Sequence, residues 1–250
     1  MFTRVKTEDE IKRMRESGKI LATILDRACN FASVGATGKD ISQFVRQELK
    51  GFGARSSFEG YEGFSDVLCV SVNDAVVHGI PNDTEFRKGD VVKFDFGVVY
   101  KEMMTDSAKT FVIGEEAEGK KKILLDTTMQ SLDAGIAAVK GGVKTGDIGA
   151  AVEAVLNKDK LGNIRELVGH GVGHAVHEQP DIPNYGTAGT GPKLEAGMTI
   201  AIEPMATLGG ERIVVDPDGW TIRTRDGSLT AHFEHTVLIT QDGAEILTKA

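Results

Sequence analysis

The sequence contains little cysteine. Cys29 and Cys69 are the two cysteines among 250 residues, and their spacing suggests no disulfide framework. Nothing in the sequence therefore requires an oxidising compartment, and a reducing cytoplasm is the simplest location for the chain.

Long apolar runs are also missing. The first nineteen residues, MFTRVKTEDEIKRMRESGK, are charged throughout and lack the apolar core of a signal peptide. No later segment stays apolar for long enough to cross a bilayer. We therefore expect neither export nor insertion into a membrane.

An excess of basic charge is absent as well. Lys and Arg number 29 against 37 Asp and Glu, which gives a formal net charge of −8, and no basic cluster is flanked by stacking aromatic residues. Such a surface repels phosphate groups, so we expect no direct nucleic-acid partner.

The sequence does contain enough apolar residues for a substantial core. Hydrophobic residues make up 40% of the chain, which allows one large domain or two tightly fused halves. No segment has the composition of a linker, so we expect residues 1–250 to form a single domain.

Hydrophobic periodicity predicts two similar runs of elements. A capping box formed by Thr7 and Glu10 precedes the first helix, and a glycine-containing stretch at 51–53 ends the second. The other expected elements are strands over 67–72 and 91–100, helices over 119–139 and 146–157, and strands over 198–204 and 235–240, the first helix covering 8–32. Two helices followed by strands thus occur twice, which indicates a pseudo-symmetric α/β domain with a site between its halves.

Five good metal ligands lie beside strand-like or glycine-rich sequence: Asp95, Asp106, His170, Glu203 and Glu234. Each is weak evidence alone, because an aspartate on the polar face of a strand is usually solvated. Glu203 is more unusual, since a carboxylate that ends an apolar strand is costly unless it is solvated, paired or bound to a cation. Together they would form a hard, oxygen-rich site, which can hold two divalent cations if some of the carboxylates bridge them. Iron, manganese, cobalt or zinc would suit these ligands.

Five segments carry a family resemblance: SVNDAVVHGIP, KFDFGVVYKEMMTDSAKTF, GHGVGHAVHEQP, MTIAIEPM and DGWTIRTRDGSLTAHFEHT. From about residue 5 to residue 248 the chain resembles the type I methionine aminopeptidases. The resemblance implies an α/β (α+β) pita-bread fold, in which an antiparallel sheet with pseudo-two-fold symmetry is backed by helices. It also implies one metal on Asp95, a second on His170 and Glu203, and Asp106 and Glu234 bridging both.

The resemblance further implies an activity. The expected enzyme removes the initiator methionine from nascent proteins whose second residue is small, using a metal-bridged water or hydroxide as nucleophile. Glu203 would carry the proton, and His78 and His177 would contact the substrate around the scissile amide. The implied partners are the nascent N-terminus and, transiently, the ribosome, and the implied oligomeric state is a monomer.

The resemblance places a methionine pocket at Tyr61, Phe64, Cys69 and Trp220, with Phe58 and Val176 at neighbouring positions. This chain departs from the usual pattern with Glu62 in place of histidine and Phe64 in place of tyrosine. Val176 stands where an aromatic residue is usual and Phe58 where a smaller one is. We therefore expect that volume has moved from one pocket wall to the other.

His174 is a further departure, spaced four residues from His170 as in a helical metal pair. The glycines at 171 and 173 oppose a helix, so we keep His170 as the expected ligand.

Two other functions fit parts of this pattern. An aminopeptidase P or prolidase uses the same five ligands, but such enzymes usually carry an N-terminal domain for which a helix starting at residue 8 leaves no room. A metal-free pita-bread module that binds peptides usually lacks several of the five ligands. Retention of all five, with His78 and His177, favours the methionine enzyme over both.

Overall fold

The computed structural model describes residues 1–249 and begins with two helices, each started by a capping box. Helix α1 (Glu8–Phe31) starts where the Thr7 hydroxyl accepts from the Glu10 amide at 3.3 Å and the Glu10 carboxylate accepts from the Thr7 amide at 2.8 Å. Helix α2 (Gly38–Phe52) repeats the arrangement with Thr37 and Asp40 and ends at Gly53, whose φ of 64° is left-handed. Helices α3 (Gly119–Ala137) and α4 (Thr145–Lys158) begin the second half of the chain.

All strand pairs are antiparallel among the described residues. The strands are β1 (Arg55–Ser56), β2 (Cys69–Val72), β3 (Ala75–Val77), β4 (Val91–Tyr100), β5 (Met103–Val112), β6 (Gly162–Asn163), β7 (Gly169–Gly171), β8 (Glu178–Ile182), β9 (Thr199–Ile202), β10 (Met205–Thr207), β11 (Ile213–Val215), β12 (Ile222–Thr224), β13 (Thr230–His232), β14 (His235–Ile239) and β15 (Ala244–Ile246). The two largest sheets are β1-β4-β2, with β5 added to β4, and β15-β14-β9-β7-β8. Of the two smaller sheets, β13-β10-β6 comes from the second half alone, and β11-β12-β3 pairs β3 of the first half with β12 of the second.

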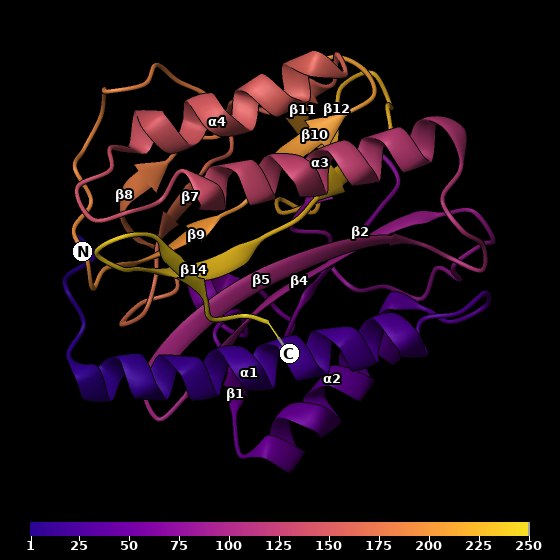
Figure 1. Ribbon diagram of the computed structural model, residues 1–250. Helices are drawn as coiled ribbons and strands as arrows, with labels where there is room; N and C mark the ends of the chain where they lie inside the picture. The colour runs from indigo at the N-terminus through magenta and orange to yellow at the C-terminus, as the bar shows by residue number, and fades with distance from the viewer. Residues whose placement is uncertain (250) are drawn as a thin grey trace.

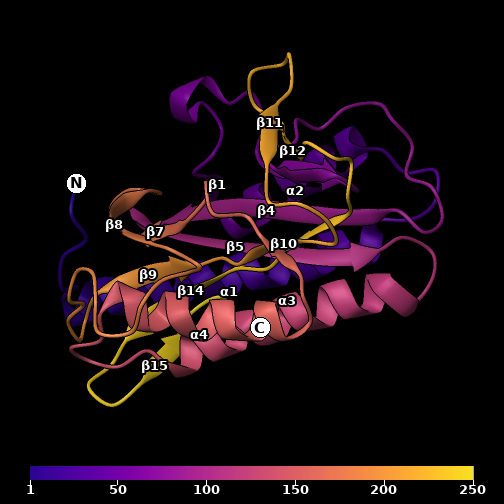
Figure 2. The same ribbon diagram turned by 90° about the horizontal axis from the view of Figure 1, so that it is seen from above.

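The helices form two pairs on the two halves of the strand layer. In the view of Figure 1, α3 runs across the upper part and α1 across the lower part of the strand layer that contains β4, β5, β9 and β14. Seen from above in Figure 2, α1, α3 and α4 lie along one side of the strands, and the β11–β12 hairpin projects from the other. This is the helix-backed antiparallel arrangement that the family resemblance implied, and its two halves agree with the pseudo-symmetry that the repeated order of elements predicted.

Each half has its own hydrophobic core. Leu21 of α1, Val45 of α2 and Phe94 of β4 belong to one buried cluster, and Leu132 of α3 and Ile200 of β9 belong to another. Burying these side chains stabilises each by roughly 1.5–3 kcal/mol, so each helix pair is fixed to its own sheet. The loops and strand ends between the two cores can therefore hold polar side chains without disrupting either core.

Each expected helix and strand is present in the structure, with differences at the ends. The strand over 91–100 coincides with β4, the one expected over 67–72 begins only at Cys69, and the one expected over 198–204 is confined to Thr199–Ile202. The long strand β5 was not predicted, and neither were the shorter strands β1, β3, β6, β7, β8, β10, β11, β12, β13 and β15. Both faces of β4 are buried, so Lys93 and Asp95, which lie opposite its apolar face, are also enclosed.

Among the described residues, no helix is both long and apolar enough to cross a membrane.

Candidate metal centre and substrate pocket

The first two predicted ligands come from one hairpin. In the register of β4 and β5, Asp95 faces Ala108 and Asp106 faces Gly97. Side chains one diagonal step apart lie on the same face of an antiparallel pair. The two carboxylates therefore point the same way, and both are buried, with 7% and 2% of their surface exposed.

The other three predicted ligands come from the second half. His170 lies in β7 and pairs with Ala201 of β9, and Ile202, the last residue of β9, pairs with His235 of β14. Glu203 follows β9 directly and Glu234 precedes β14, so these carboxylates occupy adjacent strand ends.

Hydrogen bonds hold these strand ends against β5. The Thr236 hydroxyl accepts from the Asp106 amide and donates to the Asp106 carbonyl, both at 2.8 Å. The Ser107 hydroxyl donates to the Glu234 carbonyl at 2.6 Å, and the Glu234 amide donates to Ala108 at 3.1 Å. The two halves of the molecule are thus joined at the residues that carry the predicted ligands.

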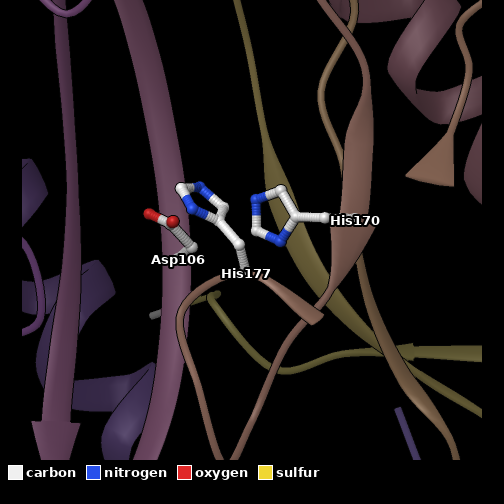
Figure 3. Close-up of side chains that lie close together, drawn as sticks. All are labelled: Asp106, His170 and His177. Atoms are coloured by element: carbon white, nitrogen blue, oxygen red, sulfur yellow. The ribbon is translucent and has the colours of Figure 1, made fainter. Parts of the chain in front are cut away.

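Three overlapping groups of side chains bring their ligand atoms within 4.8 Å of one another. They are Asp95, Asp106 and Glu234; His170, Glu203 and Glu234; and Asp106, His170 and His177. The first two groups contain all five predicted ligands and share Glu234. A shared carboxylate is what a pair of neighbouring cations needs as a bridge. Figure 3 shows Asp106 on β5 facing His170 and His177 from the other half.

Two buried carboxylate oxygens in this cluster lack hydrogen-bond partners. Within residues 1–249, Asp95 Oδ1 and Glu234 Oε1 are enclosed and unpaired, a costly state for a charged group unless a cation satisfies it. The ring of His170 is also prepared for a ligand: its Nδ1 donates to the Gly171 carbonyl at 2.9 Å, which leaves the Nε2 lone pair facing the cluster. These residues fit divalent metal.

The electrostatics of the cluster agree with that fit. Burial, followed by the repulsion of neighbouring carboxylates, raises the pKa of Asp95, Glu203 and Glu234 well above the usual range. Burial raises the pKa of Asp106 to about 7. Burial also lowers the pKa of His170 to about 3 and that of His78 to about 4, so both imidazoles are neutral at pH 7. A bound cation would offset the repulsion and the loss of solvation that these carboxylates suffer when they are ionised together.

A cavity of about 460 Å³ opens over the cluster. The predicted pocket residues Phe58, Tyr61, Phe64, Cys69 and Trp220 line it. The Phe64 ring packs edge to face on Trp220, with centroids 5.1 Å apart, and on Phe58 at 6.4 Å. One wall of the cavity is therefore apolar while its floor is acidic.

Val176 is buried in the same hydrophobic cluster as Phe58 and Phe64. It is not among the residues that line the cavity, so any influence on the pocket passes through the side chains in front of it. Glu62 does line the cavity, from an exposed turn in which its φ is 48°.

The two predicted substrate-contacting histidines lie at the cavity on different segments. His78 follows β3 with a φ of 58°, and its ring is 6.4 Å from that of Trp220. His177 precedes β8, its ring packs edge to face on His170 at 4.4 Å, and its Nδ1 is 3.1 Å from the Tyr61 hydroxyl.

The structure adds one residue that the sequence reasoning missed. His232 is buried, and its Nε2 is 3.4 Å from Glu203 Oε2. Neither ring nitrogen has a hydrogen-bond partner in the described part of the chain. Its position two residues before Glu234 was the only available signal. His174, by contrast, belongs to none of the three ligand groups and contacts Glu10 at 2.8 Å.

Comparison with known proteins identifies the family. The model of metallopeptidase family M24 matches residues 12–241. The chain belongs to metallopeptidase family M24. Its M24 relatives include the methionine aminopeptidase of Mycoplasma capricolum subsp. capricolum, which is 39% identical over 245 residues that span 98% of each chain. This member of M24 is thus a metal-dependent peptidase.

Solved structures extend the comparison. The crystal structure of methionine aminopeptidase from Thermotoga maritima matches the M24 chain with a TM-score of 0.97 and 44% identity, over all of both chains. Prolidase from Pyrococcus furiosus matches with a TM-score of 0.79 and 23% identity, over 98% of this chain and 65% of its own. The second likeness shows the fold alone, which is the expected pita-bread fold.

Proposed function

We propose that this M24 peptidase is a methionine aminopeptidase that removes the initiator methionine from nascent chains with a small second residue. The observation that carries the proposal is the position of an apolar pocket beside the carboxylate and histidine cluster. A free amino terminus and its first carbonyl can reach the floor of the cavity while the side chain packs on Phe64 and Trp220.

The ligand set we propose is Asp95, Asp106, His170, Glu203 and Glu234, holding two divalent ions of cobalt, iron, manganese or zinc. The two ligand groups that share Glu234 support a pair of ions rather than one. Bound there, the ions would supply Lewis-acid chemistry, making water a nucleophile near neutral pH and polarising the scissile carbonyl.

The protein side chains would do the remaining work. Glu203, whose pKa burial raises, is suited to accept a proton from the attacking water and return it to the leaving amine. His78 and His177 would each donate an N–H to the substrate as charge develops at the scissile amide. Tyr61, Phe64, Cys69, Trp220 and Phe58 would enclose the methionine side chain, with Val176 packed behind them.

The decisive experiment uses purified protein stripped of metal and resupplied with cobalt(II) or manganese(II). We expect hydrolysis of Met-Ala-Ser only when metal is present, and none of Ala-Pro-Ala. N-acetyl-Met-Ala-Ser is the matched control, because blocking the amine should abolish cleavage if the amine is held at the metal centre.

Other results would redirect the proposal. Cleavage of Ala-Pro-Ala alone would make the chain a proline-specific peptidase. Metal binding without cleavage of either peptide would indicate a peptide-binding module.

We further propose that the enzyme works in the cytoplasm as a monomer, on chains emerging from the ribosome. Size-exclusion chromatography with light scattering would test the oligomeric state, and co-sedimentation of the protein with translating ribosomes would test the ribosome contact.

A further inference from the structure

A buried ion pair beside the cavity has no part in the chemistry proposed above. Lys6 Nζ lies 3.2 Å from Glu178 Oε2, and both side chains have no exposed surface. Removing two charges from water costs several kcal/mol per ion, so such a pair persists only where its remaining polar atoms are also satisfied. The pair joins the start of the chain to the residue that follows His177.

The Glu178 carboxylate accepts hydrogen bonds from the backbone of the turn that leads to His177. Its second oxygen, Oε1, accepts from the His174 amide at 2.6 Å and from the Ala175 amide at 3.0 Å. Charge-assisted bonds to two consecutive amides fix the backbone more firmly than neutral ones. The carboxylate therefore sets the path of residues 173–177 between His170 and His177.

Lys6 fills the space under the same turn. Its Nζ also donates to the Thr3 hydroxyl at 2.9 Å and the Arg4 carbonyl at 3.2 Å. A Cβ on Gly173, whose φ is 143°, would lie 2.5 Å from Lys6 Cε. The glycine thus lets the lysine stem pack directly against the turn.

The segment that carries Lys6 is itself held against the second half. The amide of Thr3 donates to the Gln179 carbonyl at 2.5 Å, and that of Lys6 donates to Gly197 at 2.8 Å. Figure 1 shows the N-terminus beside β8 for this reason. His174 adds a link to α1, since its Nε2 lies 2.8 Å from Glu10 Oε1.

We propose that Glu178, held by Lys6, is a positioning residue that sets where the His177 ring lies over the metal centre. His177 is exposed, and its ring packs edge to face on the rings of Tyr61 and His170. Its position therefore depends on the backbone turn behind it. The N-terminal segment that carries Lys6 thus contributes to the position of His177. The inference rests on the proposed role of His177.

The first test is Glu178→Gln, which keeps the shape of the side chain and removes its charge. We expect kcat for Met-Ala-Ser to fall about tenfold to a hundredfold, as for a catalytic group displaced by about 1 Å. KM and the amount of bound metal should stay within twofold of the wild type. Hydrogen exchange of the His174 and Ala175 amides should accelerate, a readout that does not depend on activity.

A double substitution, Lys6→Met with Glu178→Met, separates positioning from stability. Apolar residues of similar volume often replace a buried ion pair without loss of stability. We expect the melting temperature to approach the wild-type value while kcat stays low and the two amides stay unprotected. Recovery of kcat together with stability would overturn the proposal, since the pair would then be only structural.

A matched control and a milder variant complete the design. Arg15 and Glu245 form a bidentate pair, at 2.7 and 2.8 Å, that joins α1 to β15 away from the cavity. Arg15→Met with Glu245→Gln should leave kcat and amide exchange unchanged. If the double methionine variant does not fold, Glu178→Gln decides alone: unchanged kcat with faster amide exchange would refute the positioning role. Failure of wild-type protein to cleave Met-Ala-Ser would instead refute the proposed function.

Discussion

At the scale of single residues, His177 could act as a substrate contact or as a metal ligand, and experiment can separate these two roles. One of its ring nitrogens lies within 4.8 Å of ligand atoms of Asp106 and His170, as a metal ligand would. The side chain is nevertheless exposed, and its Nδ1 contacts the Tyr61 hydroxyl. We expect His177→Ala to lower kcat by a factor that corresponds to about 2.7–4 kcal/mol, the usual cost of losing a hydrogen-bond donor to developing charge. Bound metal, measured by mass spectrometry, should be unchanged.

Tyr61→Phe is the control for that substitution. It removes only the hydroxyl that lies 3.1 Å from His177 Nδ1, so kcat should fall less than in His177→Ala. Loss of one metal equivalent from His177→Ala would show that the histidine is a ligand and that the proposed assignment is wrong.

His232 gives a second prediction at this scale. Replacing it with leucine removes the imidazole that lies 3.4 Å from Glu203 Oε2, and the loss of a group that orients a ligand typically weakens metal binding about 10–100-fold. His232→Gln keeps an N–H donor and should weaken binding less. Calorimetric titration with manganese(II) would measure both. Equal affinities for the leucine and wild-type proteins would exclude an orienting role.

The roles of some single residues could be predicted from the sequence, and those of others could not. Asp95 and Asp106 could be proposed as ligands because their motifs resemble known ones, and their common face follows from strand register. Glu178 gave no such signal, because its ionic partner Lys6 lies 172 residues away along the chain. Contacts of that kind are decided by tertiary packing and have no local pattern in the sequence.

At the scale of elements, α1 packs so closely against the C-terminal segment that replacing a glycine in the helix with alanine should destabilise the protein, although helix propensity favours alanine. A Cβ on Gly18 would lie 2.2 Å from the Leu247 carbonyl oxygen, which cannot move without shifting backbone. Alanine is favoured over glycine in a helix by about 1 kcal/mol, but we expect Gly18→Ala to destabilise the protein by roughly 1–3 kcal/mol through overpacking.

Gly51 in α2 is the matched case, because nothing lies within 4 Å of an added Cβ. Gly51→Ala should raise the free energy of unfolding by up to about 1 kcal/mol. Urea denaturation of both variants would measure the difference. A stabilised Gly18→Ala protein would mean that α1 is not held closely against Leu247.

The elements were predictable where the pattern was periodic and not where the turn was unusual. Helices α1 to α4 and strand β4 followed from apolar spacing and capping. Strand β5 did not, because its sequence, MMTDSAKTFV, alternates poorly. The hairpin turn before it uses Lys101 and Glu102 at φ values of 48° and 63°. Such turns usually contain Asn-Gly or Asp-Gly, so the sequence carried no hairpin signal.

At the scale of the whole molecule, the site exists only where the two halves meet. Asp95 and Asp106 belong to the first half, and His170, Glu203 and Glu234 to the second. The repeated order of elements indicated a site between the halves, but not which strand ends would face each other. That arrangement depends on the hydrogen bonds of Thr236 and Ser107 across the junction.

Gathering the carboxylates of both halves in one buried cluster makes the metal-free protein sensitive to pH. A carboxyl whose pKa is higher in the folded state stabilises the protein below its unfolded pKa of about 4, and that contribution is lost as pH rises through the folded value. For Asp106 that value is about 7, and burial and repulsion also raise the pKa of the other three carboxyls. With chelator present, the melting temperature should therefore fall between pH 5 and pH 8.

Asp106→Asn should flatten this dependence, because it removes one of the repelling charges, and the metal-free variant should melt above the metal-free wild type at pH 8. Asp242→Asn, at an exposed position, is the control and should change neither. Added manganese(II) should raise the melting temperature of the wild type more at pH 8 than at pH 5, since metal binds the deprotonated carboxylates. If the metal-free protein had the same melting temperature at both pH values, repulsion among the carboxylates would not destabilise the fold.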